Sequence, residues 1–119
     1  MESQIHQLLR RVGIHPDYFG YALLAYAVKL ATLEPERLLC ITKTIYPQVA
    51  QRYHTKISCV ERNLRTVIAQ SWSNQRETLQ EVAGYDLQER PTNSHMIALL
   101  SCYLLKGKQG KQKEKMGRL

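Results

Sequence analysis

The side chains best suited to a chemical role are polar and lie in one short segment. At spacings of three and four residues, a serine, a glutamate and two arginines share one stripe if the segment is helical: Ser58, Glu61, Arg62 and Arg65. Arginine can form two hydrogen bonds to guanine, and glutamate can accept one from cytosine N4. We interpret the stripe as a candidate surface for reading base pairs. The alternative is a solvated helix face in which Glu61 and Arg65 form an ordinary ion pair.

The elements that position this stripe are two helices predicted on either side of a tight turn. The first begins at Pro47 and buries Val49, Ala50 and Tyr53. The second spans residues 58–73 and buries one apolar face, made of Val60, Leu64, Val67 and Ile68. This spacing is typical of a helix-turn-helix, whose second helix enters the major groove of DNA.

The turn between these helices carries its own signals. His54 stands where the turn needs a left-handed backbone, and histidine is enriched there among residues other than glycine. Thr55 or Ser58 is expected to cap the second helix. We expect Thr55 and Lys56 to contact DNA phosphates, because hydroxyl and N–H groups at a helix start suit an anion.

The rest of the chain follows helical periodicity. We predict a helix with Ile5, Leu8, Leu9 and Val12 on its buried face, and a central one from about Pro16 to Leu33 that is apolar nearly all round. A third begins at Pro35, with Leu38, Leu39, Thr42 and Ile45 inward. A short helix spans residues 78–83, and a last one begins near Asn93. No segment alternates with period two, so the fold class is all-α: a compact bundle of about six helices containing a helix-turn-helix.

Charge divides the 119 residues unevenly. The chain has a formal net charge of +7, and the segment 106–119 holds six Lys and Arg against one Glu. We therefore predict a helical DNA-binding domain over residues 1–105 and a flexible basic tail over residues 106–119. Lys106 and Lys108 are candidates for contacting DNA phosphates, and a purely solubilising tail is the alternative.

Several classes of function have no support in the pattern. The three cysteines are scattered and odd in number, which favours a reducing cytoplasm, and the longest apolar run has 11 residues, too few to span a membrane. The His and Cys residues lack metal-ligand spacing, and no phosphate-binding loop or nucleophile motif occurs. We expect a cytoplasmic protein that is no enzyme, holds no metal or cofactor and contacts no membrane.

Several segments resemble one family in order and spacing. ITKTIYPQVAQRYHT and VERNLRTVIAQSW, preceded by GIHPDYFGYALLAYAV and followed by GYDLQERPTNSHMIALL, are similar to the C-terminal DNA-binding domain of the stage zero sporulation protein A family. The resemblance covers roughly residues 3–105. It implies a six-helix bundle that binds short asymmetric boxes of double-stranded DNA, often as a head-to-tail pair on tandem boxes. It also implies a transcription regulator that contacts RNA polymerase sigma factors.

The resemblance carries over to individual residues of the second helix. Glu61, Arg62 and Arg65 match the base-contacting positions of the family, and Ser58 matches its serine near the helix start. Two further DNA-contacting positions are changed: Cys59 stands where the family usually has arginine, and Thr66 where it usually has histidine.

The family's full-length regulators also carry an N-terminal receiver domain, whose phosphorylation relieves inhibition of the DNA-binding half. Since Met1 lies directly before the region of resemblance, we expect no receiver domain and no such control. The prediction is a sequence-specific regulator that binds double-stranded DNA. The alternative is a receiver-less interaction module that binds a full-length regulator or RNA polymerase, with little DNA affinity of its own.

Overall fold

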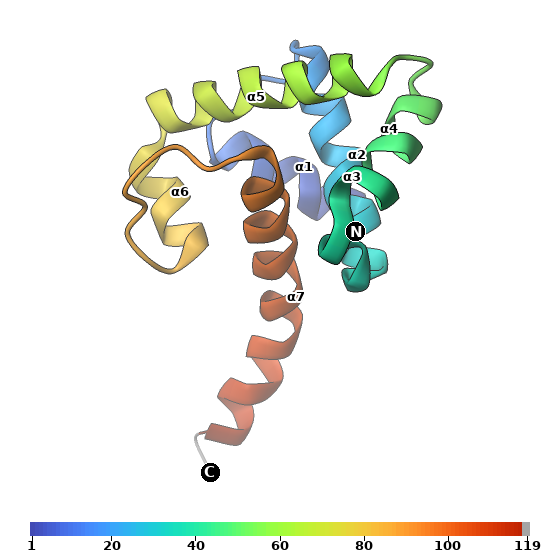
Figure 1. Cartoon of the computed structure of the whole chain (residues 1–119). Coiled ribbons are helices and arrows are strands. Elements are labelled where there is room, and N and C mark those ends of the chain that lie inside the picture. Colours follow the sequence, from blue (N-terminus) through green and yellow to red (C-terminus); the bar gives the residue numbers. More distant parts are fainter. Residues whose placement is uncertain (118–119) are drawn as a thin grey trace.

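The computed structural model describes residues 1–117, and side chains as far as Gly107. Within that range the chain is all-α, as predicted, and contains no strand (Figure 1). Its elements are α1 Glu2–Arg11, α2 Phe19–Leu33, the 3₁₀-helix η1 Pro35–Cys40, α3 Ile41–Thr44, α4 Tyr46–Arg52, α5 Ile57–Asn74, α6 Arg76–Ala83 and α7 Asn93–Gly117. These are seven α-helices and one 3₁₀-helix, against a bundle of about six helices expected, and η1 and α3 together occupy the place of the single helix predicted from Pro35.

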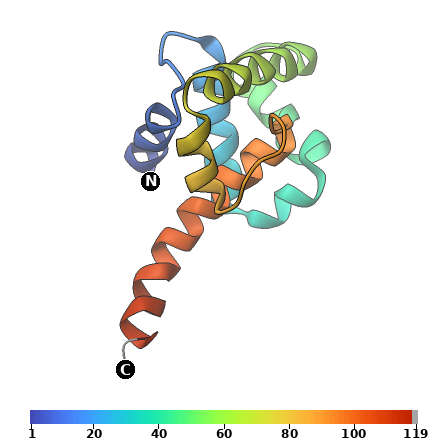
Figure 2. The ribbon, with the colours of Figure 1, turned by 90° about the vertical axis from the view of Figure 1, so that its left-hand side faces the viewer.

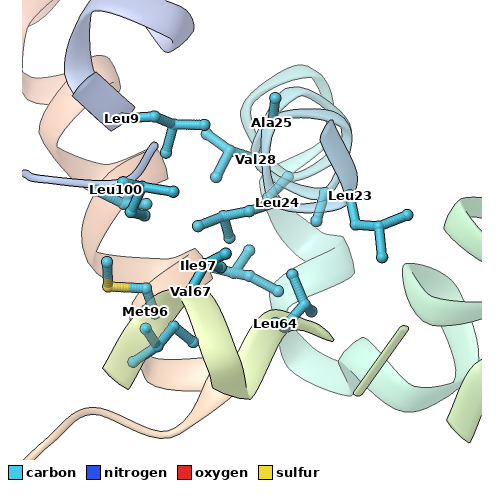
Figure 3. Packing of buried hydrophobic residues seen from close by; sticks show 14 of the residues in the cluster. Leu9, Leu23, Leu24, Ala25, Val28, Leu64, Val67, Met96, Ile97 and Leu100 are labelled. Atoms are coloured by element: carbon cyan, nitrogen blue, oxygen red, sulfur yellow. The ribbon is translucent and has the colours of Figure 1, made fainter. Parts of the chain in front are cut away.

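The core is built around α2, which packs against α1, α4, α5 and α7. The sequence predicts this central position, because apolar residues occur on all sides of α2. In the structure, ten of its fifteen residues are buried. Leu23, Leu24 and Val28 meet apolar side chains of the surrounding helices, among them Leu64 of α5 and Ile97 of α7 (Figure 3). The bundle therefore packs against one side of α5 and leaves its other side exposed to solvent.

One glycine lets α2 approach α5 closely. A Cβ atom on Gly20 would lie 2.4 Å from the backbone oxygen of Asn63 in α5, well inside a van der Waals contact. Any larger residue at this position would push the two helices apart, so Gly20 contributes to the placement of the helix-turn-helix on the core.

Two predictions about the first half of the chain are wrong in detail. α2 begins at Phe19, since Pro16 lies in the turn before it. The segment from Pro35 forms a 3₁₀-helix and a short α-helix, so an α-helical phase misplaces its side chains: Leu39, expected inward, is 88% exposed, and Thr42 is also exposed. A 3₁₀-helix has three residues per turn instead of 3.6, which accounts for the shift.

The last helix begins at α5 and leads away from it. The hydroxyl of Thr92 accepts a hydrogen bond from the His95 N–H at 3.1 Å and so caps α7. Met96, Ile97 and Leu100 are buried, after which the helix extends beyond the bundle (Figure 2).

The boundary predicted at residue 105 falls inside α7, whose backbone is helical to Gly117. Arg118 and Leu119, and the side chains beyond Gly107, lie outside the described residues. A separate flexible tail therefore stays a prediction. No helix in the described range is long and apolar enough to cross a membrane.

Candidate nucleic-acid interface

The turn between α4 and α5 has the backbone expected of a helix-turn-helix. His54 adopts a φ of +53°, the left-handed conformation predicted for it. The N–H of Thr55 then donates to the carbonyl of Ala50 at 2.9 Å, which closes the turn against α4. The chain leaves the turn through Lys56, in an extended conformation, and enters α5 at Ile57.

The predicted cap of α5 is wrong. Lys56 occupies the N-cap position, and neither Thr55 nor Ser58 donates or accepts a capping hydrogen bond. The lysine side chain has no hydrogen-bond acceptor, and α5 therefore begins without a side-chain cap. Lys56 is exposed and Thr55 half-buried, so both flank a helix start whose donors suit water or a phosphate oxygen.

The two faces of α5 divide as the periodicity predicts. Val60, Leu64, Val67 and Ile68 are buried against the bundle. The residues predicted to contact DNA gather on the other side, where Ser58, Arg62, Arg65 and Thr66 are exposed and Cys59 and Glu61 are half-buried at the edges. Four of them, Ser58, Glu61, Arg62 and Arg65, form the predicted stripe, which occupies the first turns of α5.

The cations of the stripe have no acidic partner in the part of the chain whose side chains are described. Among residues 1–107, the side chains of Arg62 and Arg65 form no ion pair or hydrogen bond, and Glu61 forms no ion pair with Arg65. The ordinary surface pair considered as an alternative is therefore not formed. Both guanidinium groups remain open to acceptors from outside the chain.

Cys59 and Thr66 each take part in hydrogen bonds within α5. Asn63 donates from Nδ2 to the sulfur of Cys59 at 3.2 Å and to its carbonyl at 2.8 Å. The Thr66 hydroxyl donates to the carbonyl of Arg62 at 3.1 Å. Cys59 therefore lies on the edge of α5 that carries Asn63, and Thr66 keeps acceptor capacity for a ligand.

The predicted phosphate contacts of the C-terminal segment lie elsewhere. Lys106 is exposed on α7, thirteen residues after Asn93, or about 20 Å along the helix. Figure 1 shows that α7 leads away from α5. At this distance along α7, Lys106 does not reach the stripe. The side chain of Lys108 lies outside the described residues.

Sequence reasoning missed a cleft beside α5. It has a volume of about 390 Å³ and lies between α5, the residues just before and at the start of α4, and the segment that leads into α7. Glu61 and Arg65 line it together with Thr42, Arg90 and Ser94. No spacing in the sequence connects these three segments. The net positive charge of the chain indicates an anionic partner but not where it binds.

The same described residues offer no metal site, since nowhere do three His, Cys, Asp or Glu side chains gather as a metal ion requires. The chain matches the model of the family described as "Sporulation initiation factor Spo0A C terminal" over residues 5–104. That family comprises helical, non-enzymatic, DNA-binding domains of transcription regulators. The match spans most of the chain and includes the whole helix-turn-helix, so the protein belongs to the Spo0A C-terminal family of DNA-binding domains.

Proposed function

We propose that this protein regulates transcription by reading a specific double-stranded DNA sequence with the first turns of α5. The observation that carries the proposal is the exposed stripe on α5, which presents two guanidinium groups that form no ion pair among residues 1–107, beside a glutamate on the second helix of a helix-turn-helix. Such a stripe suits the major groove, which admits a helix and displays a distinct donor and acceptor pattern for each base pair.

Each polar side chain then has a role that its chemistry permits. Arg62 and Arg65 donate to guanine O6 and N7, Glu61 accepts from cytosine N4, and the Ser58 hydroxyl serves either kind of partner. Thr55 and Lys56, in the turn, contact the phosphate backbone and so fix the depth and register of α5. The base contacts supply sequence preference, and the phosphate contacts supply affinity for any duplex.

The family resemblance suggests two further partners, a second copy of this chain and a subunit of RNA polymerase. We propose head-to-tail pairing of two copies on tandem boxes, and contact with an RNA polymerase sigma factor. Cooperative binding to a duplex with two boxes, compared with one box, tests the pairing directly, since independent copies would bind both duplexes with the same affinity per box.

The experiment that tests the central proposal is selection of bound sequences from a pool of random duplexes. We expect enrichment of one short motif, bound with an affinity that falls steeply as salt concentration rises. Unselected duplex should bind far more weakly at the same salt concentration. Failure to enrich any motif, with equally weak binding to all duplexes, would contradict sequence-specific reading and favour an interaction module.

A further inference from the structure

The cleft beside α5 has the chemistry of an anion site. Arg65 of α5 and Arg90 of the segment before α7 both line it and are exposed, and neither forms an ion pair or hydrogen bond among residues 1–107. Its acidic lining residue, Glu61, is half-buried. Two guanidinium groups and one carboxylate line the cleft, so its net charge is positive and it suits an anion.

Hydroxyl groups complete the donor set. Thr42 and Ser94 are exposed on the lining, and Tyr46 is only 5% exposed, with its hydroxyl beside the side chains of Asn93 and Ser94. A tyrosine hydroxyl is protonated at neutral pH and can donate a hydrogen bond, and burial raises the pKa of the Tyr46 hydroxyl further above its ordinary value. Neutral donors beside guanidinium groups suit a phosphate oxygen.

The walls of the cleft are held in place relative to α5. Asn93 donates from Nδ2 to the carbonyl of Glu61 at 3.0 Å, and Pro91 is buried. The segment that carries Arg90 is thereby attached to α5 itself. A ligand in the cleft would therefore sit at a fixed position relative to the exposed stripe.

We propose that this cleft seats one phosphate of the DNA backbone at the edge of the major groove, with Arg90 as its main ligand. The inference rests on the proposed function, because it places a backbone phosphate next to the bases that α5 contacts. Glu61 and Arg65 belong to both the cleft and the stripe, so a phosphate seated here lies beside the base pairs being read. Thr42 and Ser94 donate to its remaining oxygens.

The test replaces single phosphates of the selected duplex with uncharged methylphosphonates, one position at a time. For the unmodified protein we expect affinity to fall roughly ten-fold at the phosphate held in the cleft, as for a lost charged hydrogen bond. Arg90→Ala should bind selected and random duplexes more weakly by the same factor, and its salt slope should shrink by about 0.9. At that one phosphate, Arg90→Ala should lose its sensitivity to the methylphosphonate.

Lys106→Ala is the matched control, since it removes one positive charge about 20 Å along α7 from Asn93 and should keep the full methylphosphonate profile. Thermal melting of Arg90→Ala should match that of the unmodified protein, because Arg90 is exposed and forms no ion pair with any side chain in the described part of the chain. If Arg90→Ala keeps both its affinity and the unmodified methylphosphonate profile while the motif is still selected, the cleft proposal is wrong and the proposed function stands. If the unmodified protein selects no motif, both are wrong.

Discussion

Asn93 of α7 donates a hydrogen bond to the backbone carbonyl of Glu61 in α5, with 3.0 Å between Nδ2 and the oxygen. This contact joins residues 32 positions apart and attaches the start of the last helix to the helix that carries the exposed stripe. It also sets one wall of the cleft that we propose as a phosphate seat.

Replacing Asn93 with alanine should loosen this connection. We expect the free energy of unfolding to fall by about 1 kcal/mol, the usual net value of one intramolecular hydrogen bond. Urea denaturation followed by circular dichroism measures the change. An unfolding free energy equal to that of the unmodified protein would show that the contact does not hold the two helices together.

The packing of α5 predicts that Leu64→Asp prevents folding. Leu64 is fully buried, and an unpaired carboxylate at that site costs several kcal/mol, comparable with the whole stability of about 5–15 kcal/mol. Leu39→Asp is the matched control, because Leu39 is 88% exposed and should tolerate the charge. Thermal melts of the two variants check this, and a cooperative melt of Leu64→Asp near the unmodified midpoint would contradict the burial of α5.

The left-handed turn residue predicts different stabilities for two variants at one position. At φ +53°, a β-branched side chain clashes with the backbone, so His54→Val should be less stable than His54→Gly by about 1–2 kcal/mol. Chemical denaturation of both variants under the same conditions measures the difference. Equal stabilities would mean that the turn adopts another backbone conformation in solution.

The sequence was most informative where one pattern governed a whole helix. The all-round apolar residues of α2 and the two faces of α5 were predicted, since 3.6-residue periodicity determines which side chains turn inward. The exposure of Leu39 was not, because nothing local distinguishes a 3₁₀ turn from an α-helical one. The cleft was also out of reach, since Thr42, Arg65 and Arg90 meet only through tertiary packing.

The direction of α7 predicts different roles for two lysines. Lys56 stands at the start of α5, whereas Lys106 lies on a helix that leads away from it. Lys56→Ala should reduce the slope of affinity against salt concentration by about 0.9, the value of one phosphate contact, and Lys106→Ala should leave the slope unchanged. Binding titrations at four or five salt concentrations measure both. A reduced slope for Lys106→Ala would show that α7 reaches the DNA.

The most direct test of base reading by α5 compares Arg62→Ala and Arg65→Ala on the selected duplex and on random duplex at one fixed salt concentration. Because both guanidinium groups are exposed on α5 and form no ion pair with the side chains described as far as Gly107, we expect each variant to lose about 1–3 kcal/mol of binding free energy on the selected duplex. The loss on random duplex should be much smaller, since only the general electrostatic attraction is removed there. Equal losses on the two duplexes, for both variants, would contradict base reading by α5.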